Sequence, residues 1–285
     1  MEGENARRIH RFNMIFKSSF FYLVGFILAC IFLFPIYVLF INSFKSLKAM
    51  LTDVIGIPNK ATFTLNNYTN AFQALGSLHP FLISLIITVV STTLILLISS
   101  MAAWILVRYK TKASKAVFIL FAASMLIPFQ SEMLPLVGFA SRIGLMTPPG
   151  LVLMYMGFGT SMATVMFHGF IKNIPEELEE AATIDGCNAV QLFFIIVLPL
   201  MRTILITVAI LNVMWIWNDF LLPFLIINRE GWQTLPLKTY LFFGQFSQRW
   251  DLGSAGLFMC IIPIIVFYLS CQKYIVKGIT DGAIK

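Results

Sequence analysis

The feature that most limits how this chain can fold is the length of its stretches without charge. No Asp, Glu, Lys or Arg occurs in four windows, which are residues 18–44, 61–107, 143–171 and 252–272. A helix needs about 20 apolar residues to cross roughly 30 Å of hydrocarbon, and each window is at least that long. The windows therefore predict four membrane-spanning helices.

Two further spans are expected between these windows, in segments with few charges. All six are expected at residues 19–41, 81–107, 116–136, 150–171, 199–227 and 253–273. Composition agrees, since 59% of the 285 residues are hydrophobic and 12% are charged, far from the balance of a soluble domain. The predicted fold class is an all-α integral membrane protein with six transmembrane helices, which form a membrane domain over residues 19–275.

The positions of the basic residues predict the orientation of these helices. The net charge of +7 indicates topology here rather than affinity for nucleic acid, and no nucleic-acid partner is expected. Basic residues precede the first span in residues 1–18 and fill the short loop 108–115, so both segments are expected in the cytoplasm. An even number of spans places the loop 172–198 and the tail 276–285 there as well. Both termini are therefore predicted to be cytoplasmic.

The basic N-terminus and the sequence Leu-Ala-Cys at residues 28–30 resemble a lipoprotein signal. The apolar run continues to Ile41, however, as a membrane span does and a cleaved segment does not. The four cysteines form no C-x-x-C pair and mostly lie in predicted spans, so they are interpreted as small apolar side chains that fill space. No metal site is expected.

The segments outside the spans are short. Residues 42–79 are predicted to form a small external cap, and residues 229–252 a second outer segment rich in aromatic residues, which suit a membrane interface. Pro128 and Pro135 lie in the third span, so its outer end is predicted to be kinked or broken.

The inner loop 172–198 carries the most informative motif. Residues 175–186 predict a short helix: Pro175 suits its first turn, the following acids favour the positive end of the helix dipole, and Gly186 is suited to end it in a left-handed conformation. A second helix is expected from Asn188, running without a break into the fifth span. Five acids beside small alanines indicate a protruding contact for a partner protein, and the alternative is a solvated loop.

This loop fits the pattern E-A-A-x3-G-x9-I-x-L-P, which is the signature of binding-protein-dependent permeases of ABC importers. The matching residues are Glu180, Ala181, Ala182, Gly186, Ile196, Leu198 and Pro199. The likeness extends from about residue 34 to residue 285 and resembles the MalG-like permeases of maltose-type sugar importers. Ile195 stands where such permeases often carry a basic residue, and Thr203 where many carry proline.

The resemblance implies that the chain has the ABC importer permease fold. It also implies that the chain is a multi-pass subunit in the cytoplasmic membrane of a bacterium, in contact with lipid. It implies four partners: a second, MalF-like permease, a dimer of ABC ATPases, an extracytoplasmic solute-binding protein and a sugar substrate. The ATPase-coupling residues would be Glu180, Ala181, Ala182, Asp185 and Gly186. The outer segment could contact the binding protein through Gln245, Phe246 and Ser247, or those residues could belong only to the interfacial aromatic belt.

The chain is expected to be a transport subunit rather than an enzyme. It contains no G-x-x-x-x-G-K-[ST] phosphate loop, so ATP and magnesium would bind the partner ATPase, and no cofactor is expected on this chain. Its three histidines are scattered and no nucleophile–base pattern occurs. A secondary transporter is a weaker alternative, because no internal repeat is evident. A non-sugar substrate such as glycerol phosphate also stays open.

A candidate substrate path lies on the fifth span. Asn212, Trp215, Asn218 and Asp219 share an arc of about 120° on a helical wheel, with Trp217 roughly opposite. Polar side chains are costly toward lipid, so this arc is expected to face the bundle interior or a water-filled path. An amide can exchange hydrogen bonds with the hydroxyl groups of a sugar, and a nearby indole can pack on the apolar face of the sugar ring. The alternative is that Asn212 serves only to join helices.

Overall fold

The computed structural model describes residues 2–227, 229–244 and 248–283. Within these residues the regular structure is helical, apart from one isolated antiparallel bridge between Lys45 and Phe63. The chain divides into two compact units. One comprises Met1–Ala71 with Phe242–Phe258, and the other comprises Phe72–Leu241 with Met259–Lys285. The all-α fold class predicted from the sequence is confirmed.

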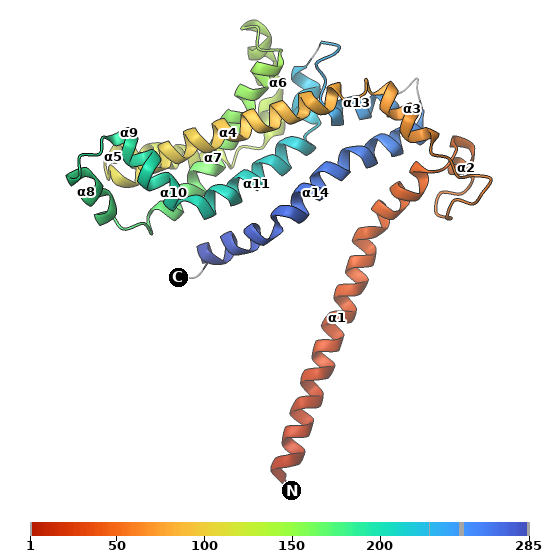
Figure 1. The fold of residues 1–285 in the computed structure, drawn as a ribbon, viewed down its shortest axis with the longest axis horizontal. Helices are drawn as coiled ribbons and strands as arrows, with labels where there is room; N and C mark the ends of the chain where they lie inside the picture. The colour runs from red at the N-terminus through yellow and green to blue at the C-terminus, as the bar shows by residue number, and fades with distance from the viewer. Residues whose placement is uncertain (1, 228, 245–247, 284–285) are drawn as a thin grey trace. The chain divides into compact units, whose positions relative to one another are not determined.

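Four helices in the described part of the chain are long and apolar enough to cross a membrane (Figure 1). They are α1 (Glu2–Ser43, apolar from Ser19), α4 (His79–Arg108), α7 (Pro148–Ile171) and α14 (Trp250–Ala283, apolar to Tyr274). Two bent helix pairs raise the possible number of spans to six if each pair crosses once. The six-span arrangement and the cytoplasmic termini stay predictions.

The first bent pair contains the predicted third span. Helices α5 (Lys112–Ser124) and α6 (Phe129–Arg142) meet at 102°, across a break that ends at Pro128. Pro128 has an extended backbone and lies directly before α6, whereas Pro135 lies inside that helix. A proline supplies no backbone N–H to the preceding turn, so the break lies where the sequence suggested it.

The second bent pair contradicts the continuous helix expected from Asn188 into the fifth span. Helix α9 (Ala189–Gln191), the π-helix η1 (Leu192–Val197) and α10 (Leu198–Leu200) are bent by 79° from α11 (Arg202–Asn218). Pro199 cannot donate to the carbonyls of η1, and Met201 has a non-helical backbone at the bend. Helix α11 then ends at the extended residue Asp219, before the short α12 (Leu221–Ile226).

The smaller unit contains residues 42–71 of the external cap predicted for residues 42–79. Helix α2 (Leu47–Thr52) and the start of α3 (Asn66–Ala74) are held by buried amides. Asn42 Nδ2 donates to the Val54 carbonyl at 2.7 Å, and Asn67 Nδ2 donates to the carbonyls of Ser43 and Lys45 at 3.0 and 2.7 Å. These bonds satisfy backbone groups of an irregular segment, so it forms a folded cap rather than a linker.

The larger unit is built on α4 packed along α7, with α11 against both (Figure 1). Small residues allow the close approach. A Cβ added at Gly159 of α7 would lie 2.5 Å from Ile95 Cδ1 of α4 and 3.0 Å from Asn212 Oδ1 of α11. Helix α13 (Leu235–Tyr240) and the single 3₁₀ turn η2 (Leu241–Phe243) follow α12 in the chain. Close contact through glycine is typical of helix pairs in membranes.

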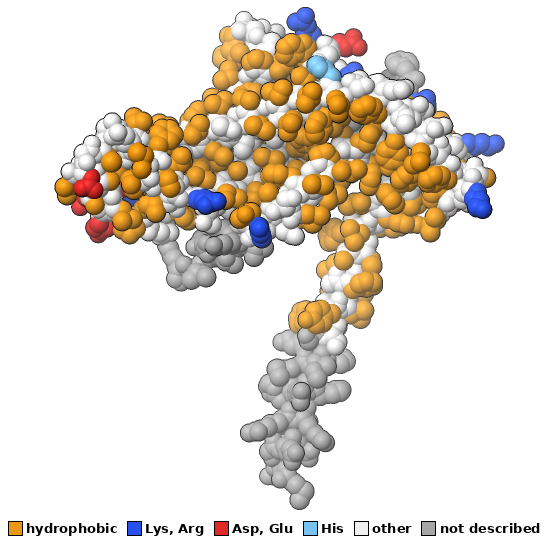
Figure 2. All heavy atoms as spheres, in the orientation of Figure 1, with side chains coloured by type: hydrophobic (Ala, Val, Ile, Leu, Met, Phe, Trp, Pro, Cys, Tyr) orange, Lys and Arg blue, Asp and Glu red, His pale blue; other side chains and the backbone are white. Residues whose placement is uncertain are grey.

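Hydrophobic side chains cover most of the face seen in Figure 2, with few charged side chains among them. Their exposure follows the helices long enough to span a membrane: in α4, for example, Ile86, Val89 and Ile105 are 57%, 52% and 47% exposed. A water-soluble protein rarely presents so extended an apolar surface. Such a surface is suited to contact with lipid chains and with other membrane subunits.

Candidate functional site

The inner loop folds as a short helix with a glycine turn at its end. Helix α8 (Glu177–Ile184) has Glu177, Glu179 and Glu180 in its first turn, where the helix dipole favours negative charge. Gly186 has a φ of +90°, as the sequence suggested. Cys187 N donates to the Ala182 carbonyl and Gly186 N to the Thr183 carbonyl, both at 3.0 Å, which together form a Schellman motif.

The chain restarts a helix directly after this turn. Asn188 Oδ1 accepts a hydrogen bond from Gln191 N at 2.9 Å, and Gln191 Oε1 accepts one from Asn188 N at the same distance. This reciprocal pair is a capping box, and it closes the N-terminus of α9. Hydrogen bonds within the loop therefore fix both the end of α8 and the start of α9.

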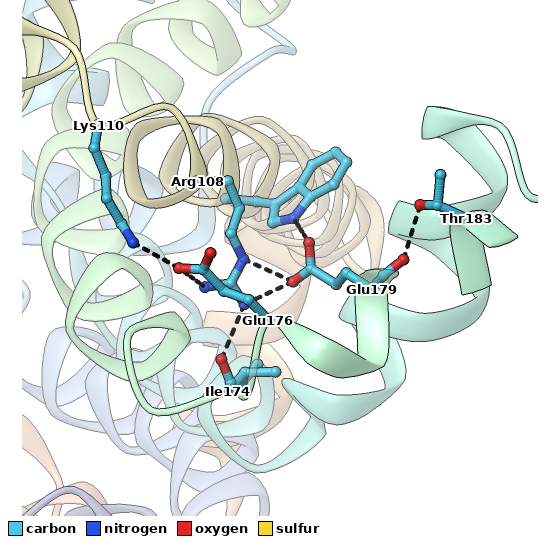
Figure 3. A network of polar contacts seen from close by, with 7 residues as sticks. Arg108, Lys110, Ile174, Glu176, Glu179 and Thr183 are labelled. Carbon is cyan, nitrogen blue, oxygen red and sulfur yellow. Dashed lines mark hydrogen bonds and ion pairs between the residues drawn. The ribbon is translucent and has the colours of Figure 1, made fainter. Parts of the chain in front are cut away.

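A buried ion pair fixes α8 to the end of α4. Glu179 points inward, and its Oε1 accepts from Arg108 Nε at 2.8 Å and lies 2.6 Å from Arg108 Nη2 (Figure 3). Its other oxygen accepts from Trp104 Nε1 at 2.8 Å. Only 12% of the Arg108 side chain and 9% of the Glu179 side chain are exposed. Arg108 Nη2 also donates to the Ile174 carbonyl at 3.1 Å, so one guanidinium joins the end of α4 to both the entrance and the interior of the loop.

A second, solvent-exposed contact lies beside this pair. Lys110 Nζ donates to Glu176 Oε1 at 2.8 Å, and Arg108 Nη1 lies 3.9 Å from the same oxygen (Figure 3). The hydrogen bond from Lys110, with the charge of that lysine, lowers the pKa of Glu176 below its ordinary value. Glu176 is exposed, so this contact adds orientation to the loop and little stability.

Most of the predicted coupling residues lie on the outer surface of the loop. Glu180, Ala181, Asp185 and Gly186 are exposed, whereas Ala182 is buried. Leu178 and Ile184 are also exposed, at 47% and 85%. Helix α8 therefore presents acids, a small alanine and two apolar side chains outward.

Sequence reasoning missed the residues that anchor α8. Arg108 was interpreted only as a topological charge, and Trp104 as part of a span. The spacing Trp104-x-x-x-Arg108 places an indole N–H and a guanidinium one turn apart at the end of α4, which is a signal for a buried anion partner. Nothing in the sequence pattern, however, distinguishes Glu179 from its neighbouring glutamates.

The four candidates for a substrate path on the fifth span lie in different environments. Asn212 is buried, and its Nδ2 donates to the Val208 carbonyl of its own helix at 2.8 Å. Trp215 is 41% exposed, and Asn218 is exposed and bonded to the Met214 carbonyl. Trp217 is buried on another side, where its Nε1 donates to the Cys260 carbonyl at 3.2 Å.

Two of the candidates share a cavity. Trp215 and Asp219 line a hollow of about 200 Å³ together with Phe129, Phe158, Leu221 and Leu222. The Tyr155 hydroxyl donates to Asp219 Oδ2 at 2.9 Å, and the Tyr155 and Trp215 rings meet edge to face at 5.5 Å. The hollow thus combines three aromatic walls with one oriented carboxylate, while Asn212 does not line it.

The predicted binding-protein contacts Gln245, Phe246 and Ser247 lie outside the described residues. Among the residues that the structure describes, no group of three or more His, Cys, Asp and Glu side chains is placed to hold a metal ion.

The sequence of this chain is similar to those of known transport proteins. Residues 94–281 match the family model described as "Binding-protein-dependent transport system inner membrane component". The chain is 42% identical over 262 residues to the "Probable starch degradation products transport system permease protein AmyC" of Thermoanaerobacterium thermosulfurigenes, covering 92% of this chain and 95% of that protein.

Two further similarities are informative. The chain is 32% identical over 265 residues to the "Melibiose/raffinose/stachyose import permease protein MelC" of Bacillus subtilis, covering 92% of this chain and 95% of the other. A chain from the crystal structure of a bacterial ABC transporter involved in the import of the acidic polysaccharide alginate has a TM-score of 0.76 and 22% identity, covering 91% of this chain and 96% of that chain. The structural likeness shows a shared fold.

Proposed function

The chain belongs to the family of binding-protein-dependent transport system inner membrane components, and from that premise we propose that it is a permease subunit of an ATP-driven importer for a sugar or oligosaccharide. It is a multi-pass membrane protein of bacteria and a transport subunit, not an enzyme. The names of its relatives, which refer to starch degradation products and to melibiose, raffinose and stachyose, support a carbohydrate as substrate.

The observation that carries the proposal is the construction of α8. A helix whose function is to receive force from a partner needs an exposed face for that partner and a rigid attachment to the membrane helices. The exposed face is formed by Leu178, Glu180, Ala181 and Ile184, and the attachment by the buried pair of Glu179 with Arg108. We infer that the partner is an ATPase subunit, which binds ATP and magnesium on its own chain.

The energy of ATP hydrolysis would then reach the membrane helices through contact. When the ATPase dimer closes, it would move α8, and α8 would carry with it the end of α4 through Arg108 and the start of the fifth span through α9 and η1. Closure would thereby shift the permease between two states of access, with the nucleotide setting their populations. A second permease chain would complete the path, and a solute-binding protein would deliver substrate from outside.

The hollow beside Trp215 is the best candidate for contact with the substrate. Its aromatic walls suit the apolar face of a pyranose ring, and the Asp219 carboxylate suits its hydroxyl groups. We therefore infer that Trp215 and Asp219 line the path, and that Asn212 holds α11 against α7.

Two glycines offer a matched test of the coupling loop. A Cβ added at Gly186 or at Gly138 meets no atom within 4 Å, but only Gly186 has a positive φ. Gly186→Ala would thus cost about 1–2 kcal/mol in the turn through the left-handed backbone alone. We expect Gly186→Ala to lower substrate-stimulated ATP hydrolysis and uptake by the reconstituted complex several-fold, and Gly138→Ala to leave both within twofold of wild type. Equal activities in the two variants would contradict a coupling function for the turn.

The substrate class requires a separate measurement, because coupling and specificity can fail independently. We expect the cognate binding protein to take up α- or β-linked oligosaccharides in a calorimetric screen that also contains glycerol phosphates and monosaccharides. A binding protein that accepts glycerol phosphates and no sugar would contradict the substrate assignment and leave the importer assignment intact.

A further inference from the structure

A cavity of about 440 Å³ lies on the larger unit, between the ends of α4 and α7 and the start of α5. It is separate from the hollow beside Trp215 and from the exposed face of α8, and the transport mechanism above does not use it. Its most polar residues are Lys110 in the connection between α4 and α5, Lys115 in α5, and Lys172 directly after α7. The cavity therefore gathers positive charge from parts of the chain up to 62 residues apart.

The positive charge in this cavity is only partly neutralised. Lys110 pairs with Glu176 at 2.8 Å, whereas no carboxylate of the described residues lies within 4.0 Å of the Lys115 or Lys172 ammonium groups. Thr111 and Ser114 add hydroxyl groups at the N-terminus of α5, where the helix dipole also favours an anion. The polar end of the cavity is thus equipped to bind a negatively charged group.

His168 forms part of the wall as a second polar feature. The residue is only 8% exposed, its ring stacks on Phe118 with centroids 3.8 Å apart, and no hydrogen bond joins it to the residues that the structure describes. Because His168 lines the cavity, an oxygen atom of a ligand there could accept a hydrogen bond from its imidazole.

The cavity changes from polar to apolar along α5. Lys110, Thr111, Ser114 and Lys115 lie at its beginning, and Phe118 and Ile119 line the cavity one turn further on. Phe118 lies seven positions after Thr111, the N-cap of α5, so roughly 10 Å of helix separates them. A phospholipid joins a charged headgroup to apolar acyl chains over a similarly short distance, about 5–8 Å of interface on each side of the hydrocarbon core. A free phosphate ion would use only the polar end, whereas a phospholipid would use both.

We propose that this cavity binds one anionic phospholipid, with its phosphate between Lys115, Lys172 and His168 and an acyl chain along Phe118 and Ile119. Basic pockets between membrane helices recognise such headgroups by charge, and each basic residue near the surface adds appreciably to the affinity. The bound lipid would join α5 to α7 beside the Arg108–Glu179 pair. The inference does not depend on the identity of the transported substrate.

The test uses the assembled importer in a neutral detergent, titrated with phosphatidylglycerol, phosphatidylcholine or inorganic phosphate, and measured by native mass spectrometry. We expect wild type to retain phosphatidylglycerol in preference to phosphatidylcholine. The double variant Lys115→Gln/Lys172→Gln should retain one lipid fewer, with an apparent affinity about 30-fold weaker at that site. The variant Lys115→Arg/Lys172→Arg keeps the charge and should keep the lipid.

Lys112 provides the matched control, because it is exposed at the start of α5 but does not line the cavity. Lys112→Gln should bind phosphatidylglycerol within twofold of wild type. Retention of the full number of lipids by the double glutamine variant would overturn the proposal. So would equal binding of phosphatidylcholine, and so would full displacement of the lipid by inorganic phosphate, which would identify a simple anion site.

Discussion

Five acids lie between Lys172 and Gly186, and at the scale of single residues they divide into two kinds. Glu179 is buried and satisfies both Trp104 and Arg108, whereas Glu176, Glu177, Glu180 and Asp185 are exposed. A buried carboxylate needs an opposite charge and hydrogen bonds to offset its lost hydration. Glu179 is therefore an anchoring residue, Glu176 is paired with Lys110, and the other exposed acids are available to a partner.

Replacing Glu179 by Gln should destabilise the loop strongly. The substitution keeps the shape but leaves the buried Arg108 guanidinium with only the exposed Glu176 carboxylate, 3.9 Å away, as counter-charge, which costs about 3 kcal/mol. We expect a clear fall in the unfolding midpoint of the solubilised complex. Glu177→Gln alters an exposed acid in the same turn and should change stability by no more than about 0.5 kcal/mol. If the two variants unfold alike, the buried pair does not stabilise α8.

Asn212 and Trp215 should respond in opposite ways to truncation. Asn212 is enclosed between helices, so Asn212→Ala is expected to lower stability by about 1–2 kcal/mol and leave the apparent sugar affinity unchanged. Trp215 lines the hollow and is 41% exposed, so Trp215→Ala should retain stability and weaken the apparent sugar affinity about tenfold. Uptake and unfolding measured on both variants check this, and unchanged uptake by Trp215→Ala would remove the hollow from the path.

At the scale of elements, the long helices follow from local hydrophobicity and their interruptions do not. The uncharged windows predicted α4 and α7, because a run of apolar residues is visible without knowledge of the partners. The break at Pro128 was also predictable from proline chemistry. The bend at Met201 was missed although Pro199 lies two residues before it, because Leu198, Leu200 and Met201 continue an apolar pattern and π-type hydrogen bonding leaves no trace in hydropathy.

The candidate site also has one part that the sequence could predict and one part that it could not. Gly186 could be predicted, since a glycine after a short acidic helix suits a left-handed turn, and its φ of +90° agrees. The pair between Arg108 and Glu179 could not, because its members lie 71 residues apart and meet only when α4 packs beside the loop. Long-range pairs of this kind require the tertiary arrangement.

Orientation of the elements is testable by labelling. In a background without the four native cysteines, we expect Thr111→Cys and Ala189→Cys to react with a membrane-impermeant thiol reagent only when the cytoplasmic face is open. Gly231→Cys should react from the outside in intact cells. Reversed labelling at any one of the three positions would contradict the six-span prediction.

At the scale of the whole molecule, the chain has the surface of a component rather than of a complete transporter. Apolar side chains are exposed along α4, α7 and α14, and the exposed face of α8 has no partner within the described chain. Its family membership implies an ATPase and a binding protein, and the phosphate loop that an ATPase needs is missing from its sequence.

The purified chain should therefore hydrolyse no ATP by itself. Hydrolysis is expected when the ATPase subunits and the second permease are added, with further stimulation by the sugar-loaded binding protein. A phosphate-release assay on successive reconstitutions measures each step. ATP hydrolysis by this chain alone, in a preparation free of ATPase subunits, would contradict the assignment of hydrolysis to the partner subunits.

Because of the π-helix η1, the number of residues in the inner loop matters as much as which residues they are. At the end of η1 the Leu198 N–H donates to the Phe193 carbonyl, five positions back instead of the four of an α-helix, so the helix accommodates one additional residue before the bend. Loss of that residue would let an ordinary α-helix form and would rotate everything before it by about 100°. The acids of α8 would then face a new direction although every one was still present. We expect insertions and deletions between Gly186 and Pro199 to be more damaging to transport than most substitutions there.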